Sequence, residues 1–239
     1  MKLILDTRIR LIGFCLLLAA CEANITNVDL DGTLTILEPS YSHSSETMRE
    51  EWIIVGNIEQ FESQVLIENQ KLYLAITSGK APFTALRPIK AQLLATPFLS
   101  WEWRIMENAE NHAPIRLTIG FADSEVQNER WLTKKLWKPA IPEFSRSLTI
   151  EWGRSALQRG VLQIYKKSQT ELPTARYISR GGRENLGRWW REIVDLSSLH
   201  SKAWPELDMQ NTEIVFAGFI VNKLGSRMSG HLGSIRLSR

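Results

Sequence analysis

Phe98-Leu99-Ser100-Trp101-Glu102-Trp103-Arg104-Ile105 is the stretch that decides the fold. Successive side chains of a β-strand point to opposite faces of a sheet. The alternation therefore places the large apolar residues on one face and the polar residues on the other. Two tryptophans on one face of a single strand predict a sheet with one face packed against a second layer.

Outward from this strand, the chain continues as short apolar runs separated by turn residues. The segment 125–136 is predicted to form a short helix. Many short strands with few helical patterns predict an all-β fold, a β-sandwich or jelly roll with short helical insertions. Strands are expected at residues 33–37, 98–105, 115–121, 147–152, 161–165, 191–195, 213–221 and 231–237, with a hairpin formed by 65–67 and 71–76.

The first segment has the pattern of a bacterial export signal. Basic residues precede an apolar run over 11–20, which ends in Leu18-Ala19-Ala20-Cys21. Ten residues rise only about 15 Å as a helix, too short to span a bilayer. These four residues resemble the cleavage and acylation site of lipoproteins. An ordinary secretory signal, with Cys21 incidental, and a buried N-terminal helix are the alternatives.

This pattern predicts three segments: a signal peptide over 1–20, a lipidated Cys21 with a polar tether over 21–50, and one β-sandwich domain over 51–239. Glu22 follows the cysteine where lipoproteins retained in the inner membrane have aspartate. We therefore expect an outer membrane lipoprotein that faces the periplasm in a Gram-negative cell, and otherwise a protein anchored to the cell membrane. Lipidation of Cys21 would leave the mature chain without a disulfide or a free thiol.

Composition argues against several classes of function. The net charge of the whole chain is +3, and without residues 1–20 it becomes +1, which is too little for a general nucleic-acid binder. The four histidines have no metal-ligand spacing, so neither a metal nor another cofactor is expected. Nine tryptophans are a high count, and their flat faces suit both a core and stacking on sugars.

Several further stretches carry a resemblance to a known family. They include Trp101-Glu102-Trp103-Arg104, residues 116–121, 148–153, 177–182 and 186–192, and His231-Leu232-Gly233-Ser234-Ile235. In this order they resemble the bacterial domain-of-unknown-function family 3047, over roughly residues 52–239. The resemblance implies an exported, galactose-binding-like jelly roll of the carbohydrate-binding type. That family often has an Asp-rich segment where this chain has Asn222-Lys223-Leu224-Gly225-Ser226, so a function of those acids does not transfer.

The most glycine-rich turn, residues 181–187, precedes two tryptophans and is flanked by arginines. It lacks the context of a phosphate-binding loop, and it is interpreted either as a tight connection or as a ligand-facing loop. On a strand, Trp189 and Trp190 would point to opposite faces, so one is expected inside; alternatively both are covered. The predicted ligand-binding residues are Trp189, Trp190, Arg188, Arg183, Arg180, Trp103 and Arg104. A second aromatic and basic cluster, residues 131–138, is either a solvated helix or a contact for acidic glycan or lipid.

Three functions remain open. The leading hypothesis is a non-catalytic, lipid-anchored envelope protein that binds a glycan or another envelope component. The second is a glycan hydrolase or lyase, which would need two carboxylates across a cleft. The third is an assembly lipoprotein with protein partners, for which a large exposed apolar patch would argue. The candidate acids are Glu102, Asp123, Glu151, Glu192 and Asp195.

Overall fold

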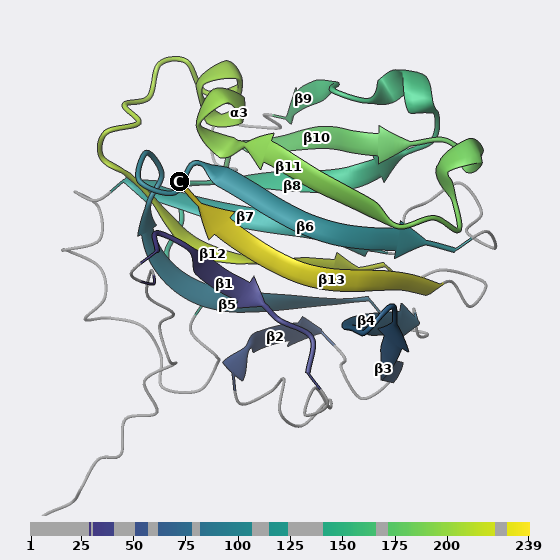
Figure 1. Ribbon diagram of the computed structural model, residues 1–239. Helices are drawn as coiled ribbons and strands as arrows, with labels where there is room; N and C mark the ends of the chain where they lie inside the picture. The colour runs from purple at the N-terminus through teal and green to yellow at the C-terminus, as the bar shows by residue number, and fades with distance from the viewer. Residues whose placement is uncertain are drawn as a thin grey trace, which may run out of the picture.

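The protein is a sandwich of two β-sheets, as the sequence predicts (Figure 1). The computed structural model describes residue 29 and residues 31–40, 51–56, 62–77, 82–106, 115–123, 141–165, 172–222 and 229–239. The predicted signal peptide, Cys21, residues 125–138 and residues 223–226 lie outside this set. No described helix is long and apolar enough to cross a membrane.

The six-stranded sheet has the order β11-β6-β13-β4-β3, with β1 also paired to β13. All of its pairings are antiparallel. Its strands are β1 (Leu34–Leu37), β3 (Glu62–Glu68), β4 (Lys71–Thr77), β6 (Phe98–Ile105), β11 (Trp190–Asp195) and β13 (Ser229–Ser238).

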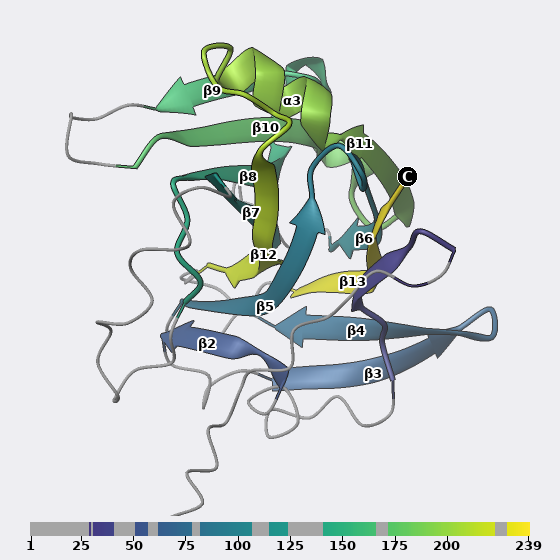
Figure 2. The ribbon, with the colours of Figure 1, turned by 90° about the vertical axis from the view of Figure 1, so that its left-hand side faces the viewer.

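The seven-stranded sheet has the order β2-β5-β12-β7-β8-β10-β9. Only β8 and β10 run parallel. Figure 2 shows the strands of the two sheets as two separate layers. The strands are β2 (Ile53–Gly56), β5 (Phe83–Gln92), β7 (Ile115–Asp123), β8 (Arg146–Gly153), β9 (Leu162–Tyr165), β10 (Thr174–Gly181) and β12 (Thr212–Val221).

The core lies between the sheets and is formed by the alternation that the sequence shows. In β6, Trp101 and Trp103 are buried and the intervening Glu102 is only partly covered. The ring of Trp103 meets those of Trp101 and Trp152 edge to face, at centroid distances of 5.5 and 5.6 Å. Because Trp152 comes from β8, these three rings join the two sheets.

The folded domain also includes residues that the sequence assigns to the tether. Leu34 and Leu37 of β1 pair with Leu237 and Ile235 of β13, and both are fully buried. The domain therefore takes in β1, which precedes the boundary at residue 51 expected from the sequence. The predicted hairpin is confirmed as β3 and β4, whose turn residues Asn69 and Gln70 have φ of 51° and 64°. Two consecutive positive φ angles are typical of a type I′ turn.

Residues 141–144 cover one half of the outer face of the seven-stranded sheet, and no other described segment is seen to do so on the opposite half. Phe144 packs against Phe216 of β12 at a centroid distance of 5.1 Å, and Ile141 joins this small cluster. A Cβ on Gly120 of β7 would lie 2.2 Å from the Phe216 ring, so only glycine leaves room for it. Residues 141–144 thus cover the side toward β12 and β5.

Helix α3 (Leu196–Ala203) packs at one end of the sandwich and is held there by a buried arginine (Figure 1). Arg146, 1% exposed as a side chain, donates from Nε to His200 Nε2 at 2.8 Å. Its Nη atoms bind both carboxylate oxygens of Asp123, at 3.0 and 2.7 Å, and Nη2 also donates to Thr212 Oγ1. One guanidinium therefore joins the helix to β7, β8 and β12.

The buried His200 should make the stability of the protein pH-dependent. Burial, with repulsion from Arg146, lowers the pKa of His200 from 6.5 to about 4. Between these values the unfolded chain binds a proton that the folded protein does not, so the unfolding free energy falls as pH falls. This difference in pKa is worth up to about 3 kcal/mol.

We expect denaturant titrations from pH 7 to pH 4 to show this loss, and His200→Gln to show a shallower one. Glutamine retains an acceptor for Arg146 and has no proton to gain. An equal pH slope in the wild-type and His200→Gln proteins would contradict the assignment.

Candidate functional site

The seven residues that the sequence nominates as ligand contacts do not form one site. Trp103 is fully buried between the sheets, packed on Trp101 and Trp152, and so does not face a ligand. Arg183 and Arg188 are exposed, on either side of the short turn after β10. Trp189 and Trp190 point to opposite faces of the sheet, as predicted, but neither is fully exposed.

Trp190 and Arg180 lie at the β11 edge of the sandwich. Trp190 is opposite Trp103 in the ladder, and its indole Nε1 donates to the carbonyl of Asn185 at 2.9 Å. The guanidinium of Arg180 lies 3.6 Å from the centroid of its ring. Arg180 also forms an ion pair with Glu192, whose side chain is almost completely buried. This cluster holds the edge strand β11 against β10. Its polar groups and the Trp190 ring already contact one another.

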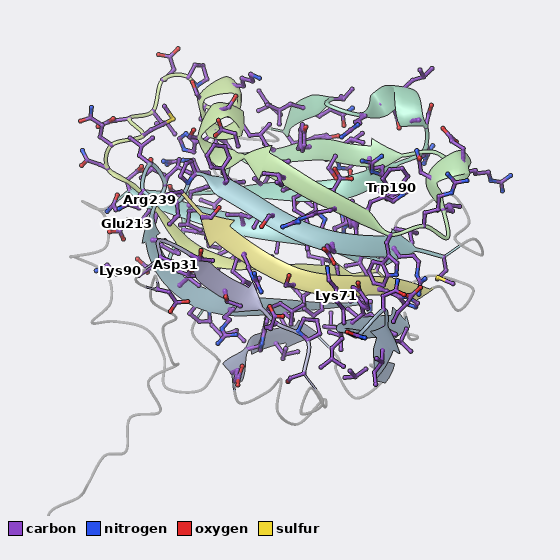
Figure 3. All side chains as sticks on the ribbon, viewed as in Figure 1. Asp31, Lys71, Lys90, Trp190, Glu213 and Arg239 are labelled. Carbon is purple, nitrogen blue, oxygen red and sulfur yellow. The ribbon has the colours of Figure 1, made fainter. Side chains whose placement is uncertain are left out.

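Trp189 belongs to a second cluster, on the outer face of the six-stranded sheet. Its ring stacks on Tyr73 of β4 at a centroid distance of 3.8 Å, and the Arg104 guanidinium lies 4.7 Å from its centroid. Its indole Nε1 donates to Glu68 Oε2 at 2.8 Å. Figure 3 shows Trp190 at the β11 end of this sheet, with Lys71 of β4 farther down, beyond β6 and β13.

Charged groups complete the Trp189 cluster. Arg104 Nη1 lies 3.1 Å from Glu68 Oε2, and Arg104 Nε donates to His231 Nδ1 at 3.1 Å. The hydrogen bond from Trp189, reinforced by Arg104, lowers the pKa of Glu68. Burial and the charge of Arg104 lower the pKa of His231 to about 4, so its ring is neutral near pH 7 and can accept from Arg104. The members of the Trp189 cluster contact one another, and they hold the turn of residues 181–187 against the sheet.

The five candidate carboxylates of a hydrolase occupy separate environments. Glu102 pairs with Lys71, Asp123 with Arg146, Glu192 with Arg180, and Glu151 with Arg176 and Arg116. Asp195 caps helix α3 by accepting from the Ser198 backbone amide. Among the described residues, no two of these five acids share an ion-pair partner. The described residues also contain no group of three acids, histidines or cysteines that could hold a metal.

A groove of about 490 Å³ lies on the outer face of the seven-stranded sheet, on the half that residues 141–144 do not cover. It crosses the parallel pairing of β8 and β10. None of the described residues that line it is acidic. The lining consists of Arg116, Thr149, Tyr165, Leu172, Thr174, Ala175 and Arg176.

The strand registers explain why these side chains meet. Thr149 is opposite Thr118 on β7 and Arg176 on β10, and Thr174 is opposite Tyr165 on β9. Residues directly opposite each other in neighbouring strands share a face. The ring of Tyr165, 42% exposed, has the guanidinium of Arg176 at 5.6 Å from its centroid. The groove therefore combines an exposed aromatic ring with hydroxyl groups and cations.

One carboxylate connects the two arginines of the groove. Glu151 forms ion pairs with Arg176 and, at 3.9 Å, with Arg116 Nη1, while only 11% of its side chain is exposed. Burial raises the pKa of Glu151 in spite of the two cations. Burial lowers the pKa of Arg116, which Glu151 opposes, and repulsion from Arg176 lowers it further. Arg116 Nη2 also donates to Asn222 Oδ1 at 2.7 Å, so its guanidinium is held in place.

The groove has no signature in the sequence. All of its lining residues except Leu172 come from four strands, and each belongs to a short segment with no motif of its own. Alternation in 115–121 does put Arg116 on the polar face. The parallel pairing of β8 with β10 brings Arg176 beside Thr149, and no local pattern indicates that pairing.

Comparison with known proteins gives structural similarity only. No protein-family model and no curated protein matches the chain. The glycoside hydrolase domain of Endo-D from Streptococcus pneumoniae R6 aligns with 79% of this chain and 22% of its own, at 12% identity and TM-score 0.36. A cellulase derived from Cel12A of Rhodothermus marinus aligns over 78% and 100%, at 10% identity and TM-score 0.44.

A family 30 carbohydrate-binding module of a cellulosomal cellulase from Clostridium thermocellum aligns over 86% of this chain and 96% of its own, at 9% identity and TM-score 0.42. The present chain thus spans about a fifth of the Endo-D chain and most of the other two. Similarities at this level establish neither a family nor a function for this protein.

The Trp189 cluster should contribute to stability. Trp189→Ala removes the stacking on Tyr73 and the hydrogen bond to Glu68, and we expect a loss of about 1–3 kcal/mol in the unfolding free energy. Chemical denaturation followed by circular dichroism measures it. Arg188→Ala, at the exposed neighbouring position, is the matched control and should change stability by less than about 0.5 kcal/mol. Equal stability of Trp189→Ala and wild type would show that the cluster does not fasten the turn.

Proposed function

We propose that this protein is a non-catalytic binding domain of the cell envelope, and that it holds a saccharide in the groove over β8 and β10. The observation that carries the proposal is the lining of that groove. An exposed tyrosine ring, two threonine hydroxyls and two arginines face one space of about 490 Å³.

The chemistry of the lining suits a sugar. Saccharide rings have an apolar C–H face that packs on aromatic rings, and hydroxyl groups at the rim that exchange hydrogen bonds with polar side chains. Tyr165 supplies the aromatic ring, while Thr149 and Thr174 supply groups that both donate and accept. Binding sites for small ligands have this form, a largely apolar concavity with a few fixed polar groups.

The choice of the groove over the tryptophans follows from their contacts. Trp189 is stacked on Tyr73, and Trp190 lies under the Arg180 guanidinium. A sugar would have to displace one of these partners. Tyr165 keeps two fifths of its surface in solvent, so it can be covered by a ligand without breaking the fold.

The proposal includes the location. We propose that Cys21 is lipidated, that the tether places the domain at a membrane surface, and that the protein faces the periplasm from the outer membrane in a Gram-negative cell. Support comes from Leu18-Ala19-Ala20-Cys21 after an apolar run and from Glu22. We also propose that the chain belongs to the domain-of-unknown-function family 3047. The support is the set of sequence stretches that resemble that family.

Binding should depend on Tyr165. The probes are an array of neutral and acidic oligosaccharides and purified insoluble peptidoglycan, presented to the full chain in detergent. Tyr165→Ala should lose at least about fivefold in affinity for whichever probe the wild type binds. Stacking of a base on one aromatic ring contributes about 1–3 kcal/mol, and we expect a similar contribution for a sugar. Calorimetry or array fluorescence measures the loss.

Trp189→Ala, measured where it remains folded, is the comparison variant and should bind like the wild type. Loss of binding in Trp189→Ala with retention in Tyr165→Ala would move the site to the other sheet. Absence of binding to every probe by folded wild-type protein would overturn the proposed function.

Lipidation should depend on Cys21. In a Gram-negative host fed an alkyne fatty acid, the wild-type chain should be labelled and should sediment with membranes, whereas Cys21→Ala should lose both properties. Cys15→Ala is the matched control, because Cys15 lies within the predicted signal peptide and should not be acylated. An unlabelled wild-type chain, or labelling that persists in Cys21→Ala, would contradict the anchor.

A further inference from the structure

We infer that the groove selects saccharides that carry a carboxylate, and that the guanidinium of Arg176 is the group that binds it. The inference rests on the proposed function, because it names the class of saccharide for the same groove. It follows from the balance of charge in the groove and from the positions of its two arginines.

The charges of the described residues in and beneath the groove do not balance. Arg116 and Arg176 line it, whereas the acid that connects them, Glu151, lies beneath them with 11% of its side chain exposed. Among these three residues two cations face one carboxylate, which is an excess of one positive charge when Glu151 is ionised. Burial is the main reason that the pKa of Arg116 is lowered, and repulsion from Arg176 lowers it further.

The two arginines have different freedom to meet a ligand. Arg116 is held by Asn222 and Glu151, and a quarter of its side chain is exposed. Arg176 has 39% of its side chain exposed. A guanidinium offers five N–H donors in a plane, so one that binds an internal acid can still donate to a second carboxylate. Arg176 is therefore the cation presented to solvent.

The position of Arg176 also brings the cation of the site close to its aromatic ring. Its guanidinium lies 5.6 Å from the centroid of the Tyr165 ring. A carboxylate bound by Arg176 would therefore lie next to the aromatic ring, within the dimensions of one sugar residue. Thr149, opposite Arg176 in the register, places a hydroxyl on the neighbouring strand. A ring that carries an acid can meet all three groups at once.

The matched probes are trigalacturonate and its methyl ester, which share one backbone and in which methylation of the carboxylates removes their negative charge. A muropeptide is a third probe, because its carboxylates lie on lactyl and peptide groups rather than on the sugar ring. Isothermal titration with the wild type should give affinity for the acid at least about tenfold higher than for the ester, since hydrogen bonds between ions contribute about 1.5–3 kcal/mol. Preference for the muropeptide over trigalacturonate would place the recognised carboxylate off the ring.

Two substitutions in the groove should act in opposite directions. Arg176→Gln should lower affinity for the acidic probe by at least about tenfold and leave the ester unchanged. Glu151→Gln removes the competing internal acid and should raise affinity for the acidic probe. Arg154→Gln, at an exposed arginine just beyond β8 and outside the groove, is the control and should bind like the wild type. If Arg176→Gln does not fold, Arg176→Lys is the substitute variant. It keeps the positive charge and should still bind the acid more tightly than the ester.

The outcomes separate this inference from the proposed function. Equal affinity for acid and ester, or an equal loss of both in Arg176→Gln, would overturn carboxylate selection and leave saccharide binding in place. A decrease of acid affinity in Glu151→Gln would also overturn it. If the folded wild type binds none of the acidic and neutral probes, the proposed function itself fails. Opposite shifts in Arg176→Gln and Glu151→Gln support the inference.

Discussion

The structure depends on the antiparallel pairing of β6 with β13. Leu232 and Ile235 of β13 lie opposite Trp103 and Trp101, one on each side of a register shift, so this pairing buries both tryptophans together with their cross-strand partners. A slip of one residue would turn both indoles toward solvent and bring Arg104 into the core, which makes the register strongly determined. The same strand β13 also pairs with β4 and with β1. The six-stranded sheet therefore assembles around one strand whose partners are far apart in the sequence. The same pairing places Arg104 opposite His231 in the Trp189 cluster.

Arginine–carboxylate pairs lie at the borders of this core, and they differ in how much of the arginine side chain is exposed to solvent. Arg146 is fully enclosed by Asp123, His200 and Thr212, and Arg180 is enclosed by Glu192 and Trp190. Removing one partner of such a pair leaves a buried charge without compensation, which is strongly destabilising. The Arg146 pair therefore holds helix α3 in place, and the Arg180 pair holds the edge strand β11. The pair of Glu151 with Arg176 differs because its arginine is 39% exposed as a side chain and lines a groove.

The sequence predicted the elements whose pattern is local. The alternation at 98–105 gave β6 with its correct inner face, and the polar pair Asn69-Gln70 marked the turn between β3 and β4. Strand β5 was missed because Pro88 and an irregular burial pattern hide its alternation, and the register does shift near that residue. Helix α3 was missed although Leu196, Leu199, His200 and Ala203 follow helical spacing after the capping Asp195. The groove could not be predicted in this way, because its residues meet only through the pairings among β7, β8, β9 and β10.

The two aromatic clusters show why the number of tryptophans does not by itself indicate where a ligand could bind. An aromatic ring can bind a ligand only with the surface that its own fold leaves uncovered, and a buried pair of rings gains about 0.5–1.5 kcal/mol beyond its area. A sugar that stacked on Trp189 would first have to break its contact with Tyr73 and the hydrogen bond to Glu68, and so would lose most of what it gained. The ring of Tyr165 lies beside the Arg176 guanidinium, and its hydroxyl donates to Gln163 Oε1 at 2.6 Å. These contacts leave 42% of Tyr165 exposed. The smaller aromatic residue is therefore the better platform, because its surroundings leave binding energy available to a ligand.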